Sequence, residues 1–285
     1  MNLIRSLQYL SFDVAVGACA GMYAVCKATD RAGVSIAHYA AMMAAVLFIY
    51  TADHFSDAAK LTPEQLQEER RIFFKRNRPA LKYLLALCSF TLIATLFFLP
   101  AETLYFGIAT GAASVVYLIS AGLAQNKKQE KTILTRPKIY KEPVIALLYS
   151  LVICGIVHPE TLLELPGCLI FICYAGIAMQ NLLIISMFEM EQDKKSGFLN
   201  LVSAIGTGHA VHLIYGLGVV VILTGAAGFL ISVSFVARFF ALVIIAMSMW
   251  LCGIMLGRRS RLIHTGAYRG LAESVFLFPV LLVFA

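Results

Sequence analysis

The sequence predicts an all-α, polytopic membrane protein, a single domain over residues 1–285 built as a bundle of nine transmembrane helices with a cytoplasmic cap of loops. Hydrophobic residues make up 60% of the chain and charged residues only 14%. Apolar stretches of about 18 residues or more, the length that a helix needs to cross a bilayer, recur along the chain. The lipid bilayer is therefore the expected surrounding of most of the protein.

The predicted membrane helices follow one another with few long connections. The turn between the seventh and the eighth is placed at 225–234, where two glycines weaken the helix. Charge does not mark this division, because Arg238 is the only charged residue in 200–257. The nine expected spans are 7–27, 35–52, 81–99, 103–123, 143–157, 166–188, 201–224, 236–256 and 268–285.

Basic residues orient the predicted bundle. Nearly all of the 23 Lys and Arg residues fall at the N-terminus and in the connections after the second, fourth, sixth and eighth spans. Only Lys27, Arg31 and Arg238 fall on the other side. Positive residues favour the cytoplasmic side, so we expect the N-terminus in the cytoplasm, the C-terminus outside, and the chain in the inner membrane of a bacterium. The same distribution accounts for the net charge of +7 without nucleic acid as a partner.

Two pairs of carboxylates stand at helical spacing on the predicted cytoplasmic face. Asp53 and Asp57 follow the second span, and Glu189 and Asp193 follow the sixth. Residues four apart lie on one helix face. Solvated side chains at helix ends are the simpler interpretation of either pair alone, but a helix C-terminus disfavours negative charge. Mg²⁺ takes one or two carboxylates from a protein and fills its shell with water and phosphate oxygens, so two facing pairs suit a site that binds a diphosphate.

Two cytoplasmic connections bring basic residues toward the same face. In the first, a helix is expected to begin with a capping box at Thr62, run to about Lys75 and cover the site as a lid. It is followed by Asn77-Arg78-Pro79. The second connection ends at Lys141, just before the fifth span. Taken alone, Lys141 is more simply a side chain that anchors the helix at the membrane boundary.

These residues together resemble the UbiA superfamily of intramembrane prenyltransferases. That family has nine helices and two aspartate-rich cytoplasmic motifs, one after helix two and one after helix six, and the first is commonly followed by Asn-Arg-Pro. Here the motifs fall on Asp53 and Asp57, with Asn77-Arg78-Pro79 downstream, and on Glu189 and Asp193. The resemblance covers nearly the whole chain in order, spacing and sidedness, and it implies a UbiA-like bundle.

The sequence departs from the family pattern within both motifs. Ile49 stands where the family has an asparagine, and Glu189 stands where the second motif begins with an aspartate. An isoleucine side chain binds neither metal nor phosphate. A glutamate keeps the carboxylate that Mg²⁺ requires and reaches one methylene further.

The resemblance implies transfer of an isoprenoid from a prenyl diphosphate to a lipophilic or aromatic acceptor, with Mg²⁺ as the cofactor. Metal ions and fixed cations stabilise the charge on the leaving diphosphate, and apolar helix walls keep water from the carbocation. The implied catalytic residues and metal ligands are Asp53, Asp57, Glu189 and Asp193. The implied diphosphate contacts are Asn77, Arg78, Lys141 and Lys194.

Two other interpretations stay open. A transporter would also be polytopic, and Asp13 and Glu273 inside the membrane could serve a proton path, although most of the other acids gather at one face. Glu273 is more simply the partner of Arg269, four residues before it. A catalytically silent family member, suggested by Ile49 and Glu189, would bind prenyl diphosphate without turnover. The sequence leaves the acceptor, the prenyl length and the oligomeric state open.

Overall fold

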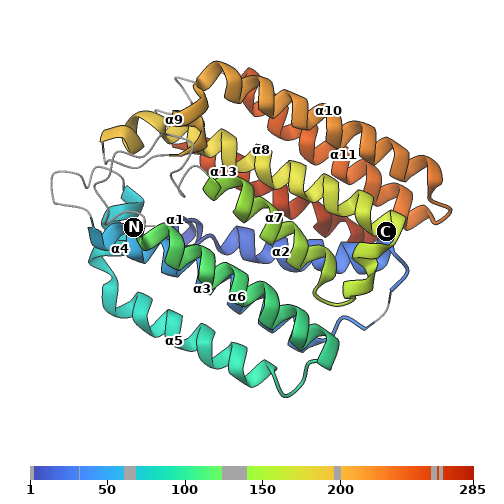
Figure 1. Ribbon diagram of the computed structural model, residues 1–285, viewed down its shortest axis with the longest axis horizontal. Helices are drawn as coiled ribbons and strands as arrows, with labels where there is room; N and C mark the ends of the chain where they lie inside the picture. The colour runs from blue at the N-terminus through green and yellow to red at the C-terminus, as the bar shows by residue number, and fades with distance from the viewer. Residues whose placement is uncertain are drawn as a thin grey trace.

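The computed structural model describes residues 3–31, 33–60, 69–123, 140–195, 200–257, 262 and 266–285, and its regular elements there are helices. Long helices lie side by side in one bundle, with the short helices α1, α4 and α9 at one end and the C-terminus at the other (Figure 1). The long helices are α2 (Phe12–Ala28), α3 (Ile36–Lys60), α5 (Arg78–Thr95), α6 (Ala101–Leu123), α7 (Lys141–Gly155), α8 (Leu165–Lys195), α10 (Thr207–Ile231) and α11 (Phe235–Leu256). The shorter ones are α1 (Leu3–Tyr9), α4 (Glu69–Arg76), η4 (Pro159–Leu163), α9 (Leu201–Ile205), α13 (Ala267–Glu273) and the 3₁₀ helix η5 (Ser274–Phe284).

Each predicted span coincides with one or two of these helical segments, and the seventh and eighth part at 232–234, inside the predicted range. Among the described residues, five helices are long and apolar enough to cross a membrane. They are Ile36–Ala59, Leu165–Lys195, Thr207–Ile231, Phe235–Leu256 and Ala267–Phe284. The all-α class and the integral membrane character are confirmed. The nine crossings and the cytoplasmic cap of loops stay predictions.

Three of the predicted spans are less regular than expected. The first is broken at Ser11, which lies between α1 and α2 with a φ of 53°. The seventh is broken at Gly206, which lies between α9 and α10 with a φ of 83°. The ninth is not a continuous α-helix, because after Glu273 it tightens into η5, which contains Pro279. Proline has no N–H to donate to the helix ladder, which favours such a change.

The glycines expected to weaken the end of span seven lie within α10 instead. A Cβ on Gly225 would come 2.9 Å from Ile245 Cγ1 of α11. Gly225 therefore permits close packing of α10 against α11, and the helix continues to Ile231 before the chain turns.

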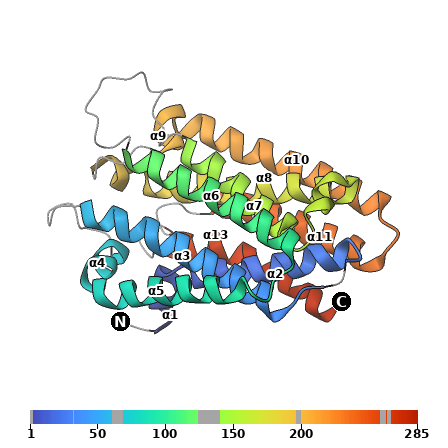
Figure 2. The ribbon, with the colours of Figure 1, turned by 60° about the horizontal axis from the view of Figure 1, so that its bottom comes forward.

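The helix α8 lies at the centre of the bundle. It packs against α7, α10 and α11, and Figure 2 shows α10 on one side of it and α3 with α5 on the other side of the molecule. Within this core Gln180 donates to the Ile214 carbonyl at 3.0 Å and accepts from Ser248 Oγ at 2.9 Å. Amide and hydroxyl contacts of this kind connect three membrane helices whose surfaces are otherwise apolar.

A second, smaller core places α4 against the end of the bundle. Phe74 of α4 is 1% exposed and packs with Ala58 of α3 and Leu81 of α5. The predicted lid helix is therefore present over Glu69–Arg76, while its expected beginning at Thr62 lies outside the described residues.

Candidate functional site

Both acidic pairs lie on the last turns of long helices. The predicted spans end just before these pairs, at residues 52 and 188, but α3 continues past Asp53 and Asp57 to Lys60 and α8 continues past Asp193 to Lys195. Their positions are therefore fixed by helix packing. Negative charge at a helix C-terminus is unfavourable unless it is compensated, and basic side chains from other helices compensate it here.

Lys141, the first residue of α7, is the cation that faces the first pair. Its Nζ lies 2.7 Å from Asp53 Oδ2 and 4.0 Å from Asp57 Oδ2. Burial disfavours the charged ammonium, but the carboxylates of Asp53 and Asp57 outweigh this and raise the pKa of Lys141 above its usual value. The ammonium group of Lys141 therefore turns inward to the acids.

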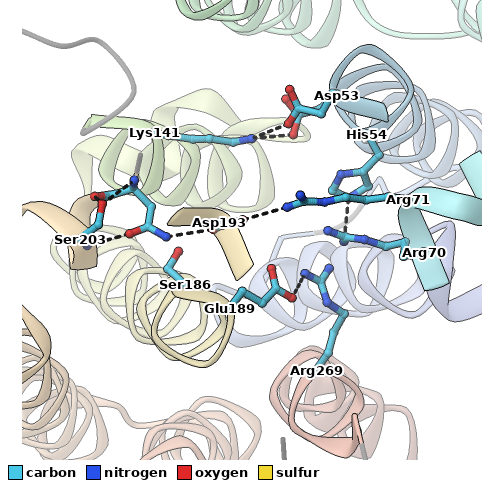
Figure 3. A network of polar contacts seen from close by, with 12 residues as sticks. Asp53, His54, Arg70, Arg71, Lys141, Ser186, Glu189, Asp193, Ser203 and Arg269 are labelled. Atoms are coloured by element: carbon cyan, nitrogen blue, oxygen red, sulfur yellow. Dashed lines mark hydrogen bonds and ion pairs between the residues drawn. The ribbon is translucent and has the colours of Figure 1, made fainter. Parts of the chain in front are cut away.

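The second pair is held by two arginines from different elements (Figure 3). Arg71 of α4 donates to Asp193 Oδ1 at 2.8 Å, and Asn200 Nδ2 donates to Asp193 Oδ2 at 3.0 Å. Arg269 of α13 donates to Glu189 Oε1 at 2.5 Å, and the Tyr268 hydroxyl donates to the same oxygen at 2.9 Å. Each carboxylate of this pair thus has a cation and a neutral donor.

Helix α4 contacts both helices that carry the acidic pairs. Arg70 Nη1 lies 3.1 Å from Nε2 of His54 on α3. Because an arginine N–H can only donate, Nε2 accepts and His54 is neutral. The neighbouring Arg71 reaches Asp193 on α8, so two consecutive residues of α4 connect the helices that carry the two pairs.

Glu142 fixes the start of α7 next to Lys141. It is 4% exposed, and its Oε1 accepts from Ser186 Oγ of α8 at 2.9 Å and from the Leu201 amide of α9 at 3.2 Å. These contacts hold α7, α8 and α9 together at this end of the bundle, and they thereby fix the position of the Lys141 backbone.

The remaining predicted contacts lie outside this network of described side chains. Asn77 Nδ2 donates to the Phe73 carbonyl at 2.9 Å and thereby closes the turn between α4 and α5. Arg78 is exposed at the start of α5, and Lys194 is exposed at the end of α8. Ile49, on α3, is half-buried.

Sequence reasoning missed several residues of the site. Arg70 and Arg71 are a double arginine in the predicted lid helix, and their adjacency was the available signal. Arg269 was paired only with Glu273, because helical spacing indicates that pair and cannot indicate Glu189, 80 positions away.

The donor set fits Mg²⁺ bound together with a diphosphate. Among the described residues, no three His, Cys, Asp or Glu side chains come together as a metal cluster. Mg²⁺ needs only one or two protein carboxylates when phosphate oxygens complete its shell, and each pair supplies two. Lysine and arginine, which now neutralise these acids, are also the side chains that bind phosphate oxygens.

Comparison with known proteins agrees on the fold. No family model matches the sequence, and no curated protein matches it. A UbiA homologue from Archaeoglobus fulgidus, solved bound to GPP and Mg²⁺, is similar in structure with a TM-score of 0.55 and 13% identity, over 99% of this chain and 98% of that chain. The same homologue bound to DMAPP and Mg²⁺ gives a TM-score of 0.53, again at 13% identity and the same coverage. The fold implied by the sequence resemblance is therefore confirmed, and this chain has the UbiA fold.

Proposed function

We propose that this protein is a UbiA-type intramembrane prenyltransferase, which moves an isoprenoid from a prenyl diphosphate to a lipophilic or aromatic acceptor at the cytoplasmic face. One observation carries the proposal: α3 and α8 each present an acidic pair at the same end of the bundle, and cations of the chain itself form ion pairs with both. A site built of alternating acids and bases suits a metal diphosphate, which carries both signs of charge.

The four acids are the proposed metal ligands and catalytic residues. Asp53 and Asp57 hold Mg²⁺ on α3, and Glu189 and Asp193 hold it on α8. When bound, Mg²⁺ supplies positive charge to the leaving diphosphate.

The cations of the site have a second proposed task. Lys141 and Arg71, released from the carboxylates, turn to the phosphate oxygens and fix the orientation of the diphosphate. Arg78 and Lys194, exposed at the same end, are proposed as further contacts. The proposed contact from Asn77 requires this side chain to give up its bond to the Phe73 carbonyl.

The neighbours' bound ligands support the substrate class. GPP and DMAPP are prenyl diphosphates, and both were bound with Mg²⁺ to a homologue of the same fold. We take prenyl diphosphate as the substrate and Mg²⁺ as the cofactor of this chain on that basis, together with the acidic pairs. The acceptor and the length of the isoprenoid are left to experiment.

The test is transfer by the purified protein. The full chain in detergent is incubated with Mg²⁺, radiolabelled prenyl diphosphates of several lengths and a membrane lipid extract, and labelled product is extracted. We expect Asp57→Ala and Asp193→Ala each to lower turnover at least about a hundredfold, because each removes charge from a metal that acts on the developing diphosphate charge.

Glu102→Ala is the matched control, since Glu102 is exposed in the first turn of α6 at the opposite end of the bundle. Equal losses in all three variants would point to general destabilisation and contradict the proposed site. Metal-dependent binding of GPP without any transfer would identify a catalytically silent protein instead.

A further inference from the structure

Arg269 lies between two carboxylates that belong to different helices. Its Nη2 is 2.5 Å from Glu189 Oε1 of α8, and its Nη1 is 3.5 Å from Glu273 Oε1, one turn later in α13. Glu189 belongs to the proposed metal site, whereas the proposed mechanism has no use for Glu273. This differs from Lys141, which lies near two carboxylates of the same acidic pair.

Glu273 is incompletely satisfied in this arrangement. It is 3% exposed, and its Oε2 is buried without a hydrogen-bond partner. Its other oxygen lies at the far limit of hydrogen-bond distance from Arg269. A buried carboxylate is costly unless it is paired and its lone pairs are filled. Glu273 therefore has carboxylate oxygens that could accept further hydrogen bonds, and Arg269 in its present position does not fill them.

The charges around Arg269 favour a second position near Glu273. The charge of Arg269 favours the ionised form of Asp13 of α2, and the charge of Asp13 disfavours the ionised form of Glu273. A guanidinium group between Asp13 and Glu273 would relieve that repulsion. Its planar fork also matches the two oxygens of one carboxylate.

We propose that Glu273 is a positioning residue for the second acidic pair, and that it receives Arg269 when Glu189 takes up Mg²⁺. The proposal rests on the proposed function, because it assumes that Glu189 is a metal ligand. A divalent cation at Glu189 repels the guanidinium group, which cannot be left buried and unpaired without a large cost. Glu273 provides the nearby carboxylate that makes this exchange possible without opening the bundle.

The test measures how much Mg²⁺ the protein needs in order to retain radiolabelled GPP. Glu273→Gln keeps the size of the side chain but removes its charge. Arg269 then has no second carboxylate to pair with, so it stays at Glu189 and competes with the metal for that side chain. We expect the Mg²⁺ concentration at half-maximal retention to rise about tenfold. At saturating Mg²⁺ the affinity for GPP should stay within about threefold of the parent. The stability of each ligand-free variant is measured in parallel by its Tm.

A double-variant comparison separates this role from a merely structural one. Arg269→Gln removes the competitor and should lower the Mg²⁺ requirement, and Glu273→Gln added to it should change nothing further. Glu160→Gln is the control, because it removes a carboxylate from an ion pair with Arg31 at the opposite end of the bundle. If Glu273→Gln does not fold, Arg269→Gln still decides, and an increased Mg²⁺ requirement would overturn the proposal.

An unchanged Mg²⁺ requirement in Glu273→Gln, or a full effect of Glu273→Gln in the Arg269→Gln background, would also overturn it. The proposed function fails separately, if the parent protein retains no GPP in Mg²⁺.

Discussion

At the scale of single residues, Lys141 connects the first acidic pair to the start of α7. Its folded-state pKa is raised above the usual value of 10.5. The stability from its ion pair is therefore fully present below that value and is lost only as the pH rises through the higher folded-state pKa. The charged ammonium is thus retained across the whole physiological range.

This gives a labelling prediction for Lys141. At about pH 9, acetic anhydride should modify Lys141 much more slowly than Lys82, which is exposed on α5, because only the uncharged amine reacts. Mass spectrometry of the digested protein measures both rates. Asp53→Asn should accelerate the reaction of Lys141, since it removes the nearest carboxylate. Equal rates for Lys141 and Lys82 in the parent would contradict the ion pair.

Glu189 is the residue whose chemistry departs most tellingly from the family pattern. Glu189→Asp should retain measurable transfer, because the carboxylate survives and a hard cation needs that charge. Glu189→Gln should lose most of it, since the amide keeps the size and drops the charge. Turnover in the lipid-extract assay measures both variants. A Glu189→Gln protein as active as the parent would remove the second acidic pair from the metal site.

At the scale of elements, close helix contacts depend on individual glycines. A Cβ on Gly17 of α2 would lie 2.5 Å from Phe276 Cβ and 2.7 Å from the Phe276 carbonyl oxygen of η5. A backbone atom cannot move aside as the end of a flexible side chain can. Gly17 therefore sets how closely α2 approaches η5.

Gly17→Ala should accordingly lower the Tm of the protein in detergent, whereas Gly228→Ala should not. In the described part of the chain, no atom beyond the local helix backbone lies within 4 Å of a Cβ built on Gly228, and alanine favours a helix by up to about 1 kcal/mol over glycine. The matched pair isolates packing from helix propensity, because both glycines lie inside helices. A fall in Tm of equal size in both variants would argue against the α2–η5 contact.

At the scale of the whole molecule, the two acidic pairs share one end of the bundle, and loop charge predicts that this end is cytoplasmic. Ser56→Cys on α3 and Lys195→Cys on α8, both at exposed positions, should react with a membrane-impermeant thiol reagent only when the cytoplasmic side is accessible. Leu163→Cys, in η4 at the other end and 88% exposed before substitution, should react from outside in intact cells. Modification of either cytoplasmic cysteine from outside would refute the orientation.

The sequence by itself determined the class of the protein and the location of its principal helices. The bilayer offers no hydrogen bonds to the backbone, so an apolar stretch of membrane length satisfies its own N–H and C=O groups in lipid by forming a helix. The sequence also determined that the two carboxylates of each acidic pair, Asp53 with Asp57 and Glu189 with Asp193, share one face of their helix. That relation depends only on spacing within one helix.

The tertiary structure decided which charges meet. Arg71 reaches Asp193 across 122 positions of sequence, and Arg269 reaches Glu189 across 80. No spacing rule relates residues on separate helices; their distance is set by how the helices pack, and packing depends on contacts such as that of Gly17 with Phe276. Ion pairs weaken with separation and strengthen with burial, so the identity of each partner in the site follows from the packed bundle and not from the order of residues along the chain.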